Sequence, residues 1–220
     1  ADEFEGDYGE EQKKMQAFLK SPEWKRTTAQ GWGVNRAETA EIFTANQMYI
    51  RKFPDRAASL LGKLHCQHYG LPSFGKRLAA ATREFVPFSG DPAGWFAQNG
   101  RFTDFSGKTI ELPERTFATH TSGKYTAARV PLLDVIAEVL RQPDEVWLNN
   151  YDGKAFDCLN YIRFYRDKAI NVVCRIENGK TLAVRTWFEI AIRPTTRSGG
   201  KIAPEKDPRL KYRRGLLVKK

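Results

Sequence analysis

The stretch RTFATHTSGKYTAARVPLLDVIAEVLRQPDEVW, residues 115–147, decides the fold. It runs from a lone His120 through a basic, hydroxyl-rich turn into an amphipathic segment. Over residues 129–141 the apolar side chains recur at helical spacing and form a broad stripe. Pro131 suits the first turn of a helix, and Pro143 ends it. We therefore expect one helix over this segment, and the sheet on which it packs should follow.

Strand-like runs follow the helix, and an Asn178-Gly179 pair between alternating apolar residues indicates a tight hairpin. Residues 212–220 have the composition of a last strand. One helix followed by consecutive hairpins predicts an α+β domain, with the helix on one face of an antiparallel four-stranded sheet. The expected strands lie at residues 146–148, 156–166, 169–176 and 181–192.

The chain before this stretch has a different pattern, and we predict three parts. Residues 1–88 have helical spacing and should form a small helical N-terminal domain. Residues 89–107 are rich in Pro, Gly and aromatic side chains, which is typical of a connector. Residues 108–220 should form the α+β domain, with a short strand at 109–112. The N-terminal helices are expected at residues 11–19, 36–52, 54–70 and 73–84.

The formal net charge of +10 favours a polyanionic partner, because Lys and Arg that neutralise phosphates release condensed counterions. Many basic surfaces serve solubility alone, so charge does not decide the function. No apolar run approaches the ~20 residues that span a bilayer, and we expect no membrane partner. The first residues are acidic and polar, without a signal-peptide pattern. Because the chain lacks an initiator Met, we expect a processed product or a fragment of a longer polypeptide.

Cysteine and histidine spacing predicts neither a metal site nor a cofactor. Cys66, Cys158 and Cys174 include no CxxC pair, and the last two fit buried strand positions. His65 and His68 could place two ligands on one helix face, but a third ligand and a supporting carboxylate are not evident nearby. Walker, GxGxxG and HExxH motifs are absent from the sequence, which argues against nucleotide hydrolysis and zinc proteolysis.

His120 and its neighbours have the side chains that RNA cleavage without a metal requires. The reaction needs a base near the 2′-OH, an acid near the 5′-oxygen and cations for the phosphorane charge. Histidine titrates in the right range for the base. Lys124 and Arg129 are the nearest cations. A loop histidine and solvated charges are the plain alternatives, but a cation near a helix start opposes the dipole, which favours a phosphate-binding reason for Arg129.

Several short motifs are spread over residues 108–220: Phe117-x-x-His120, Arg129 followed by Leu132-Leu133, Gln142-Pro143-Asp144-Glu145-Val146-Trp147, Tyr161-Ile162, Thr186-Trp187-Phe188 and Arg214-Gly215-Leu216-Leu217. Together they resemble the phage-associated members of the barnase–EndoU–colicin E5/D–RelE-like nuclease superfamily. Such domains stand at the C-termini of phage head-morphogenesis proteins and polymorphic bacterial toxins. The resemblance implies a metal-free nuclease of a helix and a four-stranded sheet that acts on RNA.

The resemblance also favours Thr186 as a fourth catalytic residue beside the three already named. Thr186 lies inside a predicted strand, where good strand propensity alone could explain it. Alternation with period two puts Thr186 and Phe188 on one face, and Arg185 and Trp187 on the other.

Tyrosines and arginines of the predicted strands are the candidate substrate-binding residues. Tyr161 and Tyr165 could stack bases or act as acids, although strand tyrosines often only pack. Arg213 and Arg214 are candidates for a second phosphate clamp. Arg185 completes the predicted substrate-binding set.

We therefore predict a metal-independent ribonuclease, a toxin domain that cleaves tRNA or other RNA in the cytoplasm of a bacterial target cell after secretion or phage delivery. A toxin implies an immunity protein, and an acidic one would suit this basic surface. The alternatives are a phage-head or DNA-packaging structural protein that binds nucleic acid, an ADP-ribosyltransferase, and a hydrolase that pairs Cys158 with His120. Asp144 and Glu145 are expected to cap or turn the chain rather than to form a catalytic pair.

Overall fold

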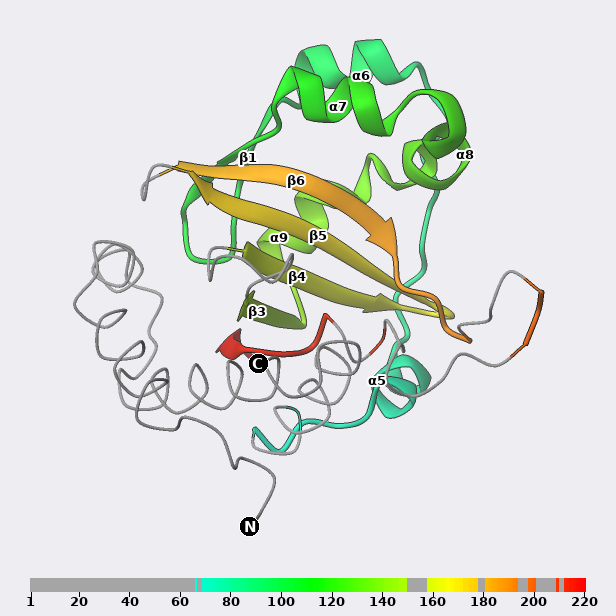
Figure 1. Ribbon diagram of the computed structural model, residues 1–220, viewed down its shortest axis with the longest axis vertical. Coiled ribbons are helices and arrows are strands. Elements are labelled where there is room, and N and C mark those ends of the chain that lie inside the picture. Colours follow the sequence, from blue (N-terminus) through cyan, green and yellow to red (C-terminus); the bar gives the residue numbers. More distant parts are fainter. Residues whose placement is uncertain are drawn as a thin grey trace, which may run out of the picture.

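The computed structural model describes residues 66, 69–149, 158–177, 181–193, 198–200, 209 and 212–220. The predicted helices that precede residue 66, the histidines His65 and His68 and the Asn178-Gly179 turn lie outside the described residues. Within the described part, a curled sheet carries helices on both faces (Figure 1). None of the helices in this part combines the length and the apolar character that crossing a membrane requires.

The described chain alternates short helices with strands. The helical elements are α5 (Phe74–Ala80), α6 (Pro92–Gln98), α7 (Glu114–His120), η2 (Gly123–Tyr125), α8 (Thr126–Arg129), η3 (Val130–Leu132) and α9 (Val135–Arg141). The strands are β1 (Arg101–Thr103), β2 (Thr109–Glu111), β3 (Glu145–Asn149), β4 (Cys158–Tyr165), β5 (Lys168–Glu177), β6 (Thr181–Glu189) and β7 (Leu216–Lys219).

Among the described residues the sheet has seven strands in the order β1-β2-β6-β5-β4-β3-β7, so the predicted count of four is wrong. The four predicted strands form its antiparallel centre, β6-β5-β4-β3. β7 pairs with β3 as the expected last strand. At the other edge β2 runs parallel to β6, pairing Ile110 with Leu182, and β1 pairs with β2. β1 was not predicted, because its three residues lie in the segment that was expected to be a connector.

The hairpins are confirmed by strand register. Asn171 faces Ile162 across β5 and β4, and Glu177 faces Thr181 at the end of β5 and β6. The β4–β5 turn contains Asp167, whose φ of 59° is the one positive φ of a non-glycine residue among the described residues. Asp tolerates this left-handed conformation better than most residues, so the turn is tight and keeps the two strands in register.

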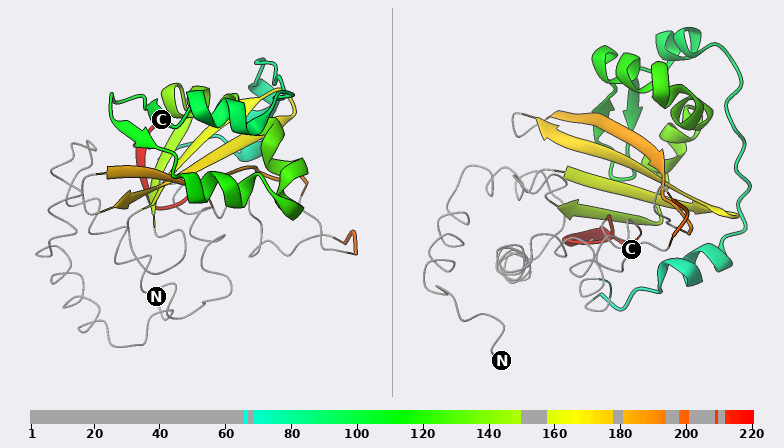
Figure 2. Two further views of the ribbon diagram at one scale, coloured as in Figure 1. Left: turned by 90° about the horizontal axis from the view of Figure 1, so that it is seen from above. Right: turned by 45° about the vertical axis from the view of Figure 1, so that its right-hand side comes forward.

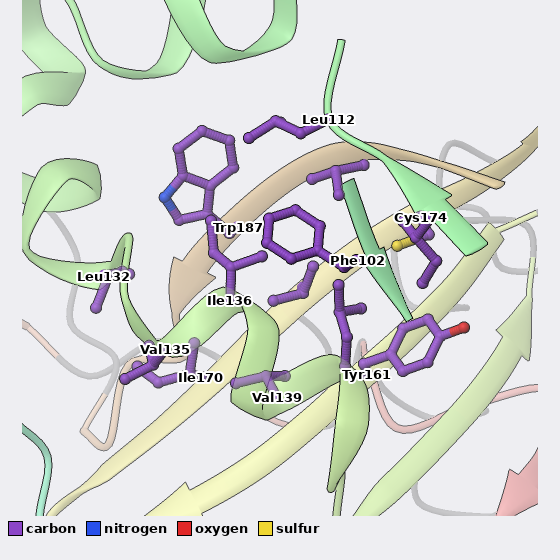
Figure 3. Packing of buried hydrophobic residues seen from close by; sticks show 14 of the residues in the cluster. Phe102, Leu112, Leu132, Val135, Ile136, Val139, Tyr161, Ile170, Cys174 and Trp187 are labelled. Atoms are coloured by element: carbon purple, nitrogen blue, oxygen red, sulfur yellow. The ribbon is translucent and has the colours of Figure 1, made fainter. Parts of the chain in front are cut away.

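The predicted helix over residues 129–141 is divided into η3 and α9. Pro131 lies in the first turn of η3 and lacks the amide that would continue the helix from α8. α9 still buries the predicted apolar stripe, including Ile136 and Val139, against the sheet. Figure 3 shows these side chains meeting Phe102, Tyr161 and Trp187 in the main core. We call the sheet face under α9 the first face.

The predicted connector carries structure that packs on the main core. α6 begins at Asp91, whose carboxylate accepts a hydrogen bond from the Gly94 amide, with Pro92 in the first turn. Trp95 of α6 stacks on Phe117 of α7, with ring centroids 6.2 Å apart. α7 itself was not predicted. Figures 1 and 2 show α6, α7 and α8 grouped beside β6, with α5 and β7 at the other end of the sheet. The predicted domain boundaries stay predictions.

The second face of the sheet packs on α5 and on the chain before β7. Ser73 caps α5 by accepting a hydrogen bond from the Lys76 amide, and the helix stops at Ala80 because Ala81 is extended. α5 is therefore shorter than the predicted helix at 73–84. Phe74 of α5 meets Phe164 of β4 edge-on, with ring centroids 5.4 Å apart. This second core also contains Trp147 and Ile162.

Candidate active site

His120 is the last residue of α7 and comes directly before a turn, as predicted. Pro113 starts the helix with extended backbone, and buried Phe117 anchors it to α6. Three residues later the helix presents His120 in a partly buried position. The imidazole lies against Trp187 of β6, with ring centroids 5.2 Å apart, and beside Tyr125, with centroids 5.9 Å apart. His120 is thus held where α7 meets β6.

A hydrogen bond fixes the tautomer of the neutral His120 ring. Its Nδ1 lies 2.8 Å from the carbonyl oxygen of Thr116. Because a carbonyl oxygen only accepts, Nδ1 must donate, and Nε2 of the neutral ring carries the lone pair. None of the described residues forms a hydrogen bond to Nε2. The ring therefore presents a basic nitrogen in a fixed orientation.

The ring of Tyr125 brings the two predicted cations together with His120. Lys124 lies in η2 with an exposed side chain, and its Nζ is 5.1 Å from the Tyr125 ring centroid. The Arg129 guanidinium carbon is 6.0 Å from the same centroid. Three of the four predicted catalytic residues therefore lie around one ring, that of Tyr125. We call these residues, with Tyr125 and Trp187, the His120 cluster.

Arg129 and Trp187 bind each other reciprocally across the edge of the sheet. The Arg129 guanidinium donates to the Trp187 carbonyl, and the Trp187 indole donates to the Arg129 carbonyl at 3.0 Å. The guanidinium also lies over the Phe188 ring, 5.2 Å from its centroid. This pair ties α8 to β6 and holds the indole against which His120 packs. Sequence periodicity could not reveal it, because the partners are far apart in the chain.

β6 contains a bulge next to Thr186, and Thr186 lies on the opposite face of the sheet from Trp187 of the His120 cluster. Val173 pairs with Thr186 and Cys174 with Val184, so Arg185 is an extra residue. Trp187 belongs to the first-face core, whereas Phe188 packs on the second face, as alternation predicted. Thr186 shares the face of Phe188 and is buried. It therefore points away from the imidazole.

The bulge also corrects the predicted position of Arg185. Ala183 faces Arg175, which faces Cys158, in one row across β6, β5 and β4. Arg185 lies two residues beyond Ala183 on the same face, and its Nη1 is 4.0 Å from Cys158 Sγ. The prediction that Arg185 shares the face of Trp187 is wrong. Arg185 is the extra residue of the bulge, so Arg185 and Thr186 both lie on the second face, and the alternation resumes at Trp187.

The two predicted base-stacking tyrosines are in the main core. Tyr161 has no exposed surface and donates to Asp104 Oδ2 at 2.9 Å. Burial raises its pKa well above the usual value, helped by Cys174 and Asp104. Tyr165 is 1% exposed, and burial raises its pKa as well. In this conformation neither ring can stack on a base, and neither phenol can ionise near neutral pH.

Arg213 is bound to Glu145, a buried carboxylate that was expected only to cap or turn the chain. Glu145 has no exposed surface and accepts from Arg213 Nη2 at 2.7 Å and Nε at 2.8 Å. Arg77 and the Trp147 indole also donate to it, at 3.1 and 2.9 Å. Burial acts to lower the pKa of Arg213, but the bonds to Glu145 outweigh it and raise the pKa. We call Glu145, Arg213, Arg77 and Trp147 the Glu145 cluster; it leaves Arg213 no exposed donor for a phosphate clamp.

Arg214 and Cys158 are also remote from His120. Arg214 is 4% exposed, and burial lowers its pKa to about 10, with the nearby Cys158 acting in the opposite direction. Cys158 is buried on the second face, whereas His120 packs on first-face Trp187. The sheet therefore separates the thiol from the imidazole, and the Cys–His hydrolase alternative has no pair to act with.

Within the described part of the chain, no three or more His, Cys, Asp or Glu side chains gather closely enough to hold a metal ion. The chemistry available at the His120 cluster is that of one imidazole, one ammonium and one guanidinium around two aromatic rings. These groups can transfer a proton and stabilise a negative charge on a phosphate.

Comparison with protein families found one match. The model of the PBECR2 family, described as phage-Barnase-EndoU-ColicinE5/D-RelE like nuclease2, matches residues 87–218. The chain belongs to this family. The match confirms the resemblance and extends it toward the N-terminus, so that α6 and β1 are also part of the PBECR2 domain. Comparisons with curated proteins and with solved structures found no match.

Membership in PBECR2 makes the chain a nuclease-family protein and leaves the roles of individual residues open. The structure adds Tyr125 and Trp187 to the residues that sequence analysis proposed. Trp187 was quoted as part of a motif and assigned to a face of its strand but given no role in the site, and Tyr125 was not considered. In the sequence, Tyr125 is an aromatic residue between two basic residues, Lys124 and Arg129, and close to His120, the only histidine of the described residues. In the structure its side chain is 37% exposed. Clustering of that kind follows from the fold rather than from a period in the sequence.

Proposed function

We propose that this PBECR2 protein is a metal-independent endoribonuclease and that the His120 cluster is its active site. The observation that carries the proposal is the His120 ring itself. Thr116 fixes its Nδ1, its Nε2 is available to a substrate, and Lys124 and Arg129 lie around the neighbouring Tyr125 ring. Family membership supports nucleic-acid cleavage, and the net charge of +10 supports a polyanionic substrate.

In the proposed reaction, His120 Nε2 takes the proton of the 2′-OH. The 2′-oxygen then attacks phosphorus, and the bond from phosphorus to the 5′-oxygen breaks. The exposed Lys124 ammonium gives a proton to the 5′-oxygen. Arg129 stabilises the charge of the phosphorane with its planar donors. The products are a 2′,3′-cyclic phosphate and a 5′-hydroxyl, and proton exchange with water restores both side chains.

The other predicted site residues have no part in this reaction. Tyr161, Tyr165 and Arg213 are each at most 1% exposed, and Thr186 faces the opposite side of the sheet. Arg185 contacts Cys158 on that side too. The burial of Tyr161, Tyr165, Arg213 and Thr186 supports packing roles within the fold.

Within this function we propose tRNA as the RNA class and a bacterial toxin as the setting. The support is the family's phage association and the basic surface, which would also suit an acidic immunity protein. Production of the protein in the bacterial cytoplasm should arrest growth, and a cognate immunity protein should relieve the arrest. Growth at the normal rate with full-length protein present would rule out the toxin.

The test of the site is cleavage of total tRNA in EDTA by wild type and by His120→Asn. Asn keeps an N–H that can donate to the Thr116 carbonyl but removes the base. We expect the rate to fall roughly 10²- to 10⁴-fold. The melting temperature should stay unchanged. Arg101→Ala, an exposed arginine of β1, is the control for charge and should cleave like wild type. Full activity of His120→Asn would remove this residue from the site. Bound but intact tRNA with wild type would favour a structural nucleic-acid-binding protein instead.

A further inference from the structure

A groove lies next to the His120 cluster, between α8, η3 and the ends of β5 and β6. It encloses about 840 Å³, which is the size range of small-molecule and cofactor sites. Its walls include three aromatic side chains, Phe85, Phe188 and Tyr212, and two cations, Arg129 and Lys168. Neither the family description nor the proposed reaction assigns a role to this groove.

We propose that the groove binds the single-stranded RNA next to the cleaved phosphodiester, with a base against its aromatic wall and a phosphate at Lys168. The proposal rests on the ribonuclease function above and adds a substrate-binding site to it. It also gives the substrate class more closely, because a base can enter the groove only when it is unpaired.

The aromatic rings and the cations of the groove are arranged in pairs. Lys168 Nζ is 5.3 Å from the Phe85 ring centroid, and the Arg129 guanidinium carbon is 5.2 Å from the Phe188 centroid. Single-stranded nucleic acids are bound by this combination, since every base has a face for stacking and every linkage carries a negative phosphate. Stacking of this kind tolerates many sequences.

Each phenylalanine ring of the groove packs on a neighbouring tyrosine ring, so the phenylalanines form preorganised surfaces. Phe85 meets the buried Tyr165 edge-on, with centroids 6.0 Å apart. Phe188 packs on Tyr212, with centroids 4.9 Å apart. Both phenylalanines are nevertheless only partly buried, so part of each ring reaches the groove. A ring that is fixed before binding loses little conformational entropy when a base stacks on it.

Arg129 connects the groove to the catalytic residues. Its guanidinium lies over Phe188, which lines the groove, and over Tyr125, which stacks on His120. Arg129 is therefore shared by the groove and the His120 cluster, and a strand bound in the groove would pass this residue to reach the imidazole. This continuity distinguishes the groove from a general basic surface.

Glu189 does not prevent phosphate binding at Lys168. Its carboxylate is 3.2 Å from Lys168 Nζ, and both side chains are more than one third exposed. Ion pairs with this exposure contribute little to stability, so a phosphate can displace the carboxylate at small cost. The freed carboxylate can then accept a hydrogen bond from a base amino group.

The test is binding of a fluorescein-labelled, single-stranded 2′-O-methyl RNA, measured by anisotropy at several salt concentrations. This strand has no 2′-OH to attack and cannot be cleaved. Lys168→Ala should weaken binding roughly three- to tenfold and lower the slope of log affinity against log salt by about 1. Phe188→Leu, which keeps an apolar side chain, should weaken binding without changing that slope. Arg101→Ala is the matched control, because it removes one exposed positive charge outside the groove.

The outcomes separate this proposal from the ribonuclease proposal. Equal weakening by Lys168→Ala and Arg101→Ala would mean that only net charge matters and would overturn the groove. No binding by wild type, or wild-type binding by Lys168→Ala and Phe188→Leu, would overturn it as well. Because the strand is not cleavable, selective weakening would support the groove even if wild type left every natural RNA intact. If wild type cleaves RNA but the groove variants bind the strand as wild type does, the proposed active site would be kept and the proposed groove site would be wrong.

Discussion

The His120 cluster and the Glu145 cluster both combine charged and aromatic side chains, but they differ in exposure: the His120 cluster reaches solvent, whereas Glu145 and Arg213 are buried. Glu145 and Arg213 are at most 1% exposed, and each bond that the carboxylate accepts comes from a fixed neighbour. In the His120 cluster, Lys124 and Tyr125 reach solvent, and the imidazole keeps one nitrogen for a substrate. Charges that are fully paired inside a protein hold its parts together, whereas charges at a rim can act on a ligand.

Position in the sheet explains this difference. The Glu145 cluster lies where β3, α5 and the chain before β7 meet, and Arg213 also donates to the Pro72 carbonyl at 2.8 Å. It therefore joins segments from both ends of the described chain. The His120 cluster lies beside the part of β6 that extends past β2, whose pairing ends at Ala183. Helices rather than a strand cover that edge, and their ends supply the reactive side chains.

The largest expected effect concerns stability. Glu145→Ala would leave Arg213 as a buried charge without its carboxylate, which should lower the free energy of unfolding by about 3–5 kcal/mol. Urea unfolding followed by tryptophan fluorescence measures this change. Arg101→Ala breaks the exposed pair with Glu111 and should cost less than about 1 kcal/mol. Equal losses in the two variants would contradict the view that the buried cluster holds the fold.

Arg129 and Arg213 should differ in what their loss affects. Arg129→Ala should lower kcat roughly 10²- to 10³-fold, because the phosphorane loses a donor. Arg129→Lys keeps the charge but not the planar fork, and we expect an intermediate rate. Arg213→Lys should instead lower the melting temperature and leave the kcat of the folded fraction near that of wild type. A reversed pattern, with Arg213→Lys impairing kcat and Arg129→Ala impairing only stability, would exchange the roles of the two clusters.

A smaller effect should appear at alkaline pH beside the Glu145 cluster. Cys66 Sγ donates to the Arg213 carbonyl at 3.4 Å. Burial raises the pKa of this thiol from an ordinary value of 9.0 to about 11, with Arg213 opposing and Glu145 adding to the shift. Because the folded pKa exceeds the unfolded one, this contribution to stability is complete below about pH 9 and is lost as the pH rises to about 11.

The slope from Cys66 should be at most about 1.4 kcal/mol per pH unit in that window. Urea unfolding of wild type and Cys66→Ala across this pH range isolates it, since the other titrating groups are common to both proteins. The free energy of wild type should fall more steeply with pH than that of the variant. Parallel curves would show that the thiol is not buried in the native protein.

Sequence periodicity was sufficient for the centre of the fold and insufficient for its edges. The long strands follow from their strand-like apolar runs, and the apolar stripe of α9 follows from helical spacing. α7 was missed because a seven-residue helix with the single buried side chain Phe117 has almost no stripe. β2 was expected as a short strand, but its parallel pairing with β6 depends on tertiary contacts that no local pattern contains.

The same limit applies to the candidate site. His120, Lys124 and Arg129 were proposed from residue type and local sequence, and they lie around one tyrosine ring. The strand candidates failed to join them for reasons that sequence could not supply. Tyr161 donates its hydrogen bond to Asp104. Arg213 donates to Glu145, a carboxylate that was expected only to cap or turn the chain. Whether a polar side chain in a strand faces a partner or a substrate is decided by what packs over it.

The most direct test uses strands of 2′-deoxynucleotides that contain a single ribonucleotide, incubated with the protein in EDTA. The account predicts one cut, on the 3′ side of the ribose, which leaves a 2′,3′-cyclic phosphate and a 5′-hydroxyl and is lost in His120→Asn. Cleavage of an all-deoxy strand at a similar rate, or products with 5′-phosphate ends, would contradict attack by the 2′-hydroxyl and with it the proposed role of His120.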